Sequence, residues 1–207
     1  MQSLLAGGWL WLAVGYLLGS IPFGLLLTRA AGLGDLRSIG SGNIGTTNVL
    51  RTGSKKLAAA TLLLDVGKGS AAVLLARCLS PVDAAPLAGI GAFLGHLYPV
   101  WLRFAGGKGV ATMLGIAAAY LWPAGLVFAL VWIGAALPSR ISSVGGMSAA
   151  VAAPVAALLI GRTDAALLLG GMALLVLWKH RANIARLRAG TEPRMGSGKK
   201  DAGATHD

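Results

Sequence analysis

Long apolar segments separated by short polar ones constrain this chain more than any other feature. A membrane-crossing helix needs about 20 mostly apolar residues. Seven candidate spans follow one another along the chain, at 4–28, 57–76, 84–101, 110–122, 124–137, 147–160 and 164–178. The two spans beside Trp122-Pro123 are short, so five or six crossings also remain open. The pattern predicts an all-α, polytopic integral membrane helix bundle with about seven transmembrane helices.

Composition agrees with a chain that lies in a bilayer. Of the 207 residues, 56% are hydrophobic and 12% are charged, and the mean hydropathy is +0.73. These values are too apolar for a soluble domain of this length. No Lys or Arg precedes Arg29, and the first apolar run is too long for a cleaved signal peptide, so we expect it to remain as a helix.

The basic residues are divided unevenly between the two ends of the expected spans. With seven spans, fifteen of the 18 Lys and Arg fall on one side and two, Arg77 and Arg162, on the other, while Lys68 lies within a span. Basic loops mark the cytoplasmic side. We therefore expect the N-terminus outside and the C-terminus in the cytoplasm. A single domain is expected over residues 1–195, followed by a disordered polar tail at 196–207.

The loop after the first span carries the glycine pattern Gly40-x-Gly42-x-x-Gly45. This spacing matches a dinucleotide-binding fingerprint, but the fingerprint requires a strand before it and a helix after it, and a membrane span precedes it here. What remains is that glycines allow backbone N–H groups to turn toward an anion. Further donors in this loop are Ser41, Asn43, Thr46, Thr47 and Asn48, and Arg51 supplies a charge. Taken alone, such a loop is more often only a flexible connection.

Three more polar clusters are expected on the same side of the membrane. One holds His96 and the lysine of Gly106-Gly107-Lys108-Gly109, which opens an expected helix but lacks the Ser or Thr of a Walker-A motif. Another holds Ser142 and Ser143, and the last holds His180 and Asn183, whose spacing places them on one helical face. Four donor-rich clusters on one face predict a site that binds more than one phosphate.

Together these stretches resemble the bacterial acyl-phosphate:glycerol-3-phosphate acyltransferase family (PlsY type) over nearly the whole chain. The likeness rests on Gly19 to Gly24, Ser41 to Arg51, Gly95 to Thr112, and His180 to Gly190 followed by Glu192. The chain departs from the usual family pattern at Thr46, where Ala is common, and at Tyr98 and Ala105, where Phe and Lys are frequent.

The resemblance implies transfer of a fatty acyl group from acyl phosphate to the 1-hydroxyl of glycerol 3-phosphate, giving lysophosphatidic acid and phosphate, in a bacterial cytoplasmic (inner) membrane. Because the donor is a mixed anhydride that the hydroxyl can attack directly, we expect no acyl-enzyme. It implies catalytic roles for Ser41, Arg51, Lys108, His180 and Asn183. It implies substrate-binding roles for Gly42, Asn43, Gly45, Thr47, Asn48, His96, Gly106, Gly107, Gly109, Ser142 and Ser143. Which residue meets which phosphate stays open, and so does whether His180 acts as a base or as a phosphate donor.

The alternative from a different class is a membrane transporter of a phosphorylated metabolite. A transporter needs polar residues at mid-membrane depth on several spans, and only Asp65 and Lys68 qualify, where they are expected to pair near the end of one helix. We expect no cofactor, no metal and no nucleic acid, because the seven acidic residues are scattered and the basic residues indicate topology. The expected partners are the two substrates and membrane lipid, and the oligomeric state is left open.

Overall fold

The computed structural model describes residues 2–195. All regular secondary structure in that range is helical. The disordered polar tail expected at 196–207 lies outside the described residues. In chain order the elements are α1 (Gln2–Gly19), α2 (Phe23–Ala30), η1 (Leu36–Ser38), α3 (Thr46–Leu50), α4 (Lys55–Leu79), α5 (Ala85–Leu97), η2 (Val100–Leu102), α6 (Val110–Tyr120), α7 (Trp122–Ser139), α8 (Ser142–Leu159), α9 (Thr163–Lys179) and α10 (Arg181–Arg188).

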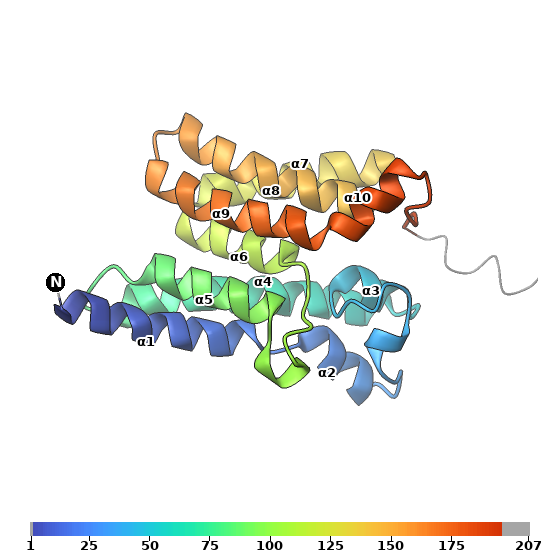
Figure 1. Cartoon of the computed structure of the whole chain (residues 1–207), viewed down its shortest axis with the longest axis horizontal. Helices are drawn as coiled ribbons and strands as arrows, with labels where there is room; N and C mark the ends of the chain where they lie inside the picture. Colours follow the sequence, from blue (N-terminus) through green and yellow to red (C-terminus); the bar gives the residue numbers. More distant parts are fainter. Residues whose placement is uncertain (1, 196–207) are drawn as a thin grey trace, which may run out of the picture.

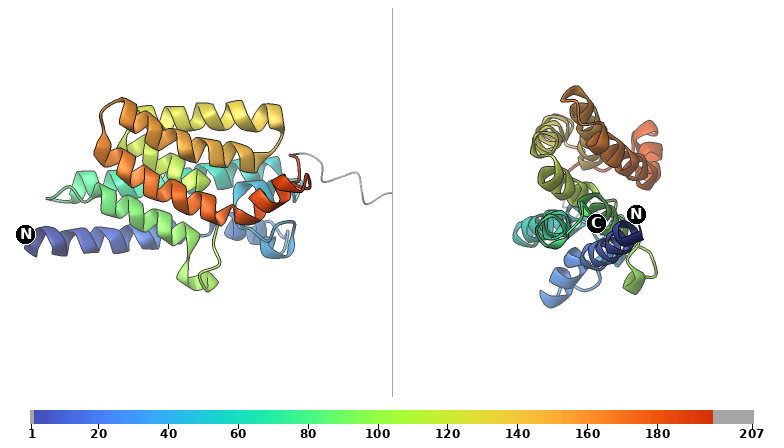
Figure 2. Two further views of the ribbon diagram at one scale, coloured as in Figure 1. Left: turned by 45° about the horizontal axis from the view of Figure 1, so that its top comes forward. Right: turned by 90° about the vertical axis from the view of Figure 1, so that its left-hand side faces the viewer.

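The long helices form two groups that lie side by side. Helices α1, α4 and α5 pack together, as do α7, α8 and α9, and the short helix α6 contacts members of both groups (Figures 1 and 2). The shorter elements α2, α3 and α10 gather at one end of the bundle (Figure 1). This arrangement places the loops before α3, before α6 and before α10 at the same end.

Small residues allow a close contact between α1 and α5. A Cβ atom added at Gly15 would lie 2.1 Å from the carbonyl oxygen of Ala88, and one at Gly19 would lie 2.0 Å from that of Ala92. A glycine of α5 also allows this approach, because a Cβ atom added at Gly91 would lie 2.1 Å from the Leu12 carbonyl oxygen. Such backbone approach is how helices gain packing energy where lipid competes for apolar side chains.

The expected spans all correspond to helices, with differences at their ends. The first span, 4–28, is divided into α1 and α2 at Ser20-Ile21-Pro22, because proline has no N–H to continue the helical ladder. Within residues 2–195, five stretches are long and apolar enough to cross a membrane, or six if the bent pair α9 and α10 counts as one span. Helix α6 has only 11 residues, about 16 Å of rise against a hydrocarbon core of about 30 Å. A full crossing by α6 and the count of seven therefore stay predictions.

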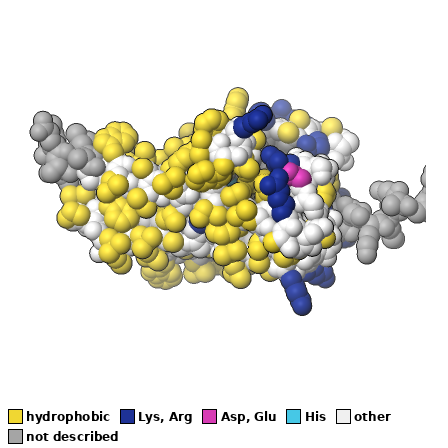
Figure 3. Space-filling model, turned by 90° about the horizontal axis from the view of Figure 1, so that it is seen from below, with side chains coloured by type: hydrophobic (Ala, Val, Ile, Leu, Met, Phe, Trp, Pro, Cys, Tyr) yellow, Lys and Arg dark blue, Asp and Glu magenta, His cyan; other side chains and the backbone are white. Residues whose placement is uncertain are grey.

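The surface is apolar over most of its length and basic toward one end (Figure 3). Large side chains such as Leu63, Trp122 and Leu159 are 71%, 70% and 83% exposed. A soluble protein would not leave so many large apolar groups in water, whereas lipid solvates them. The fold is that of an integral membrane bundle whose polar loops collect at one end.

Candidate functional site

The glycine-rich loop is held together by the side chain of Asn48, which is buried. Its amide nitrogen donates to the carbonyl oxygens of Leu36 and Ile39, both at 2.9 Å. Its amide oxygen accepts from the backbone N–H of Ser41 and from Arg51, both at 3.3 Å. Both amide hydrogens are thus used inside the loop, so Asn48 supports the loop and offers no free N–H to a phosphate.

Glycine is required where this loop approaches Arg51. Gly40 and Gly42 have φ angles of 56° and 67°, in the left-handed region that favours glycine. A Cβ at Gly40 would lie 2.6 Å from an Arg51 guanidinium nitrogen. Arg51 donates a hydrogen bond to Asn48. It forms no ion pair within residues 2–195. Its charge is therefore available to an anion beside the loop.

Helix α3 joins this loop to the third cluster. The hydroxyl of Thr47 lies 2.8 Å from that of Ser142, the first residue of α8. Asn43 accepts from the backbone N–H of Gly45 at 2.9 Å, which fixes the turn before α3. Residues 95 positions apart in the sequence are thus in direct contact. Such a contact is expected if the first and third polar clusters belong to one site.

Thr46 differs from its neighbours because its hydroxyl is buried and has no hydrogen-bond partner within residues 2–195. An unsatisfied buried hydroxyl destabilises the folded state. We therefore expect Thr46→Ala to keep full activity and to leave the free energy of unfolding unchanged or raise it by up to about 1 kcal/mol. Thermal unfolding of the purified variant in detergent, with Thr47→Ala as the control that loses a contact, checks this. A clear loss of activity in Thr46→Ala would contradict it.

The second cluster folds back over the end of α5. The backbone N–H groups of Gly106 and Gly107 donate to the carbonyl oxygens of Leu97 and His96, at 3.2 and 3.0 Å. A Cβ at Gly107 would lie 2.0 Å from His96 Nε2, so no larger residue fits there without a shift. Gly109, with φ of 87°, begins α6. These glycines place Lys108 at the N-terminus of α6, where the helix dipole favours anions.

Lys108 belongs to a hydrogen-bonded network that includes the fourth cluster. Its ammonium donates to the amide oxygen of Asn183. The Asn183 amide nitrogen donates to Glu192, which also accepts from Ser143 at 2.6 Å and from Arg186 at 2.7 Å. Glu192 therefore connects α8, α10 and the loop before α6, although the sequence named it only as part of the resemblance and gave it no role.

Charge and burial set the protonation of this network. Burial lowers the pKa of Lys108 to about 8, with Glu192 opposing the shift and Arg186, Arg51 and Lys179 adding to it. Partial burial raises the pKa of Glu192, but hydrogen bonds from Ser143, Asn183 and Arg186 outweigh it and lower the pKa below its ordinary value. Glu192 is therefore ionised at neutral pH, and Lys108 is a cation poised near its pKa.

His180 is buried between α9 and α10. Its Nδ1 atom lies 2.8 Å from the carbonyl oxygen of Val176. A carbonyl only accepts, so Nδ1 carries a proton in this contact and Nε2 of the neutral ring is an acceptor. A Cβ at Gly146 would lie 3.7 Å from Nε2, which places that nitrogen against α8.

A groove of about 330 Å³ opens between the first, second and fourth clusters. It is lined by Ser41, Gly42, Asn43, Ala105, Gly106, Lys108, Lys179, Arg181 and Ala182. Two of its cations, Lys179 and Arg181, were absent from the sequence-based site. Lys179 donates to the Leu97 carbonyl oxygen at 3.2 Å and lies over the Tyr98 ring. The sequence could have indicated these two cations, because they flank His180 directly.

His96 contacts the groove wall from behind and does not line the groove itself. It is buried, and its Nδ1 lies 3.8 Å from Asp65, whose carboxylate is 2.7 Å from Lys68. The expected pairing of Asp65 with Lys68 is confirmed. Its expected place near a helix end is wrong, because both residues lie in the middle of α4 and are buried there.

A bundle of apolar helices whose one end gathers cations, hydroxyls and helix N-termini around a groove is a membrane protein that binds a phosphate-bearing ligand. Comparisons with known proteins give the particular family. The family model described as glycerol-3-phosphate acyltransferase matches residues 9–190. The chain therefore belongs to the glycerol-3-phosphate acyltransferase family.

Individual relatives agree over almost the whole chain. The glycerol-3-phosphate acyltransferase of Ruegeria sp. (strain TM1040) is 66% identical over 186 residues, which are 90% of this chain and 92% of the relative. That of Roseobacter denitrificans is 55% identical over 199 residues, 96% of this chain and 100% of the relative. The crystal structure of PlsY, an integral membrane glycerol 3-phosphate acyltransferase in its glycerol 3-phosphate form, is similar with a TM-score of 0.86 and 36% identity, covering 91% of this chain and 96% of that one.

Proposed function

We propose that this chain transfers a fatty acyl group from acyl phosphate to the 1-hydroxyl of glycerol 3-phosphate, releasing lysophosphatidic acid and inorganic phosphate. The observation that carries the proposal is the groove in which Lys108, Lys179 and Arg181 face the glycine-rich loop at the end of an apolar bundle. Both substrates bear a phosphate, which cations bind. Acyl phosphate also bears a fatty acyl chain, which packs against the apolar surface of the bundle. The similar PlsY structures in glycerol 3-phosphate and lysophosphatidic acid forms support the acceptor and the product.

In the proposed mechanism the site works by positioning and by charge. Arg51, Lys108 and the N-terminus of α6 hold substrate phosphate and stabilise the negative charge that grows as the acyl–phosphate bond breaks. The acceptor hydroxyl attacks the acyl carbon directly, since a mixed anhydride is already activated. Its proton passes to a substrate phosphate or to His180 Nε2, the unprotonated ring nitrogen.

The choice of donor is tested by an assay of the purified protein with acyl phosphate, acyl-coenzyme A and acyl carrier protein as alternative donors. We expect lysophosphatidic acid only from acyl phosphate. Product from acyl-coenzyme A at an equal rate would overturn the proposed donor. Family membership favours this enzyme over the transporter alternative.

We also expect that no covalent acyl-enzyme forms. Cys78 is exposed near the opposite end of α4, and Ser41 and Ser142 have no hydrogen bond to a histidine within residues 2–195. None of these three side chains therefore has the partner that activates a nucleophile. Enzyme mixed with radiolabelled acyl phosphate and no acceptor, then quenched in acid, is expected to carry no label. Stoichiometric label that chases into lysophosphatidic acid on adding acceptor would refute direct attack.

The groove is proposed to face the cytoplasm of a bacterial inner membrane, as the distribution of Lys and Arg supports. In a Cys78→Ala background, Ala182→Cys marks the groove end and Asp83→Cys marks the opposite end, and both positions are exposed. In intact spheroplasts a membrane-impermeant maleimide is expected to label Asp83→Cys and to spare Ala182→Cys until the membrane is permeabilised. The reverse pattern would invert the proposed topology.

A further inference from the structure

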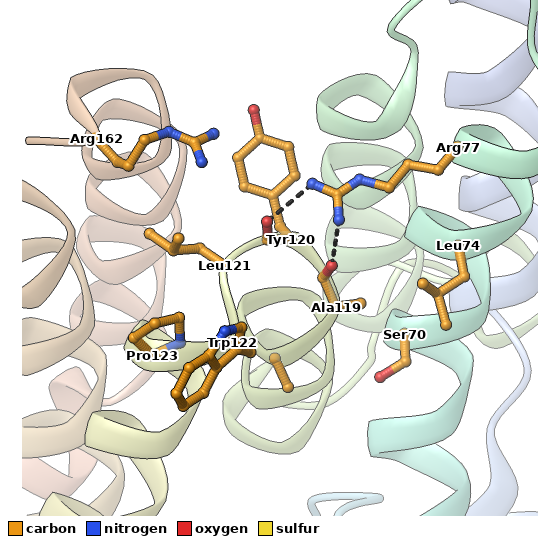
Figure 4. A pocket seen from close by; sticks show the side chains of 10 residues that line it. Ser70, Leu74, Arg77, Ala119, Tyr120, Leu121, Trp122, Pro123 and Arg162 are labelled. Carbon is orange, nitrogen blue, oxygen red and sulfur yellow. Dashed lines mark hydrogen bonds between the residues drawn. The ribbon is translucent and has the colours of Figure 1, made fainter. Parts of the chain in front are cut away.

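A second cavity, of about 700 Å³, lies at the opposite end of α4 and α6 from the groove (Figure 4). It is lined by Ser70, Leu74, Arg77, Ala118, Ala119, Tyr120, Leu121, Trp122, Pro123 and Arg162. Leu74 and Trp122 are 48% and 70% exposed, and their surroundings belong to the apolar belt of the bundle. The cavity therefore opens toward hydrocarbon, so its natural occupant carries an apolar chain.

The cavity arises because α6 is shorter than its neighbour. Helix α6 ends at Tyr120 after 11 residues, whereas α4 spans 25 residues and reaches Leu79. The last carbonyl groups of a helix have no partner within it, and lipid offers none. Arg77 of α4 satisfies two of them, donating to the oxygens of Ala119 at 2.6 Å and Tyr120 at 2.8 Å (Figure 4). These bonds fix the guanidinium at the mouth of the cavity.

The two arginines of the cavity differ in their charge balance. Arg162 forms an ion pair with Asp164 at 2.7 Å, and Asp164 also accepts from the Tyr120 hydroxyl at 3.0 Å. Arg77 lies over the Tyr120 ring and, within residues 2–195, forms no ion pair. A guanidinium has five N–H groups, and two carbonyls occupy only part of them. Arg77 is thus a fixed cation with unused donors that, in the described part of the chain, has no ion-pair partner.

We propose that this cavity binds one anionic phospholipid, with its phosphate at Arg77 and an acyl chain along Leu74, Leu121 and Trp122. A guanidinium suits phosphate because it donates two parallel hydrogen bonds. The apolar walls supply the rest of the affinity, so a free phosphate ion lacks most of the binding surface. In the topology proposed above, this lipid comes from the outer leaflet. The site is separate from the acyl-transfer groove and does not depend on the reaction.

The test is native mass spectrometry of the full chain released from nanodiscs that contain equal amounts of phosphatidylglycerol and phosphatidylcholine. We expect one phosphatidylglycerol retained per wild-type chain, and at least a tenfold lower retained fraction in Arg77→Gln. Leu74→Trp fills the cavity while Arg77 and its two carbonyl contacts remain, so it is expected to lose the lipid with the fold intact. Lys56→Gln removes one positive charge from the exposed other end of α4 and is the matched control.

The outcomes separate the proposal from its competitors. Phosphatidylcholine also has a phosphate but no net charge, so equal retention of the two lipids would overturn the proposed selection of an anionic phospholipid. Retention by both Arg77→Gln and Leu74→Trp at the wild-type level would place the lipid elsewhere. A dimer that carries no lipid would show that a second copy of the chain covers the cavity. If Arg77→Gln fails to fold, Leu74→Trp decides the result: loss of the lipid supports the proposal, and retention at the wild-type level overturns it.

Discussion

Replacing Lys108 with methionine is expected to lower kcat by about 30- to 1,000-fold, corresponding to the loss of about 2–4 kcal/mol of transition-state stabilisation. Methionine keeps much of the length of the side chain and removes the charge. The ammonium lies at the N-terminus of α6 beside the groove, where charge develops on the leaving phosphate in the proposed reaction. Removing a contact that strengthens in the transition state lowers kcat more than it changes KM.

The matched control for Lys108→Met is Lys56→Met, which removes an exposed lysine at the start of α4. It is expected to keep wild-type kcat. Steady-state kinetics with acyl phosphate and glycerol 3-phosphate measure both variants. If Lys108→Met turns over as fast as Lys56→Met, Lys108 has no part in the chemistry, even though it lines the groove.

The pKa of Lys108 gives the same residue a pH signature. Because burial lowers that pKa to about 8, the free enzyme holds the ammonium below this pH and loses it above. The wild-type kcat/KM is therefore expected to fall as the pH rises through about 8, with a slope that approaches tenfold per pH unit well above it. Lys108→Met is expected to lack this descending limb, although its remaining activity is low.

The fold was predictable because the bilayer imposes a simple rule. Apolar runs of membrane length become helices, and every span expected from hydropathy overlaps a helix in the structure. The ends were less accurate where a local interaction decides them. Pro22 divides the first run, and the chain past Leu97 folds back into η2, so that α5 stops before the expected end at 101. Hydropathy contains no information on either event.

The site was predictable as a set of loops and not as a network. Glycines and cations marked segments that lie close together in the structure, but the contacts within them join residues over long sequence separations. Asn48 reads as a donor and is used up inside its own loop. Glu192 was given no role from the sequence and accepts hydrogen bonds from Ser143 and Asn183. Such partners come from different helices, so no local pattern reports them.

The largest stability effect is expected at Asp65, which lies in the middle of α4 with its carboxylate 2.7 Å from Lys68. Both side chains are buried, and Lys68 also donates to the Ile21 carbonyl oxygen at 2.9 Å. Removing one member of a buried ion pair leaves the other charge without a partner. Asp65→Leu is therefore expected to lower the free energy of unfolding by about 3–5 kcal/mol, measured by denaturant titration in detergent micelles.

The double variant Asp65→Leu/Lys68→Leu separates the contribution of the two charges to stability from that of the volume their side chains fill. With both charges gone the desolvation cost disappears, and apolar replacements of a buried pair are commonly neutral or stabilising. The double variant is expected to regain most of the lost stability, short of about 1–3 kcal/mol for the Ile21 carbonyl oxygen left without its donor. Leu63→Ala, on the exposed face of the same helix, is expected to change little. A double variant as unstable as Asp65→Leu would show that this pair contributes through its contacts with His96 and Phe23, which both leucines fail to replace.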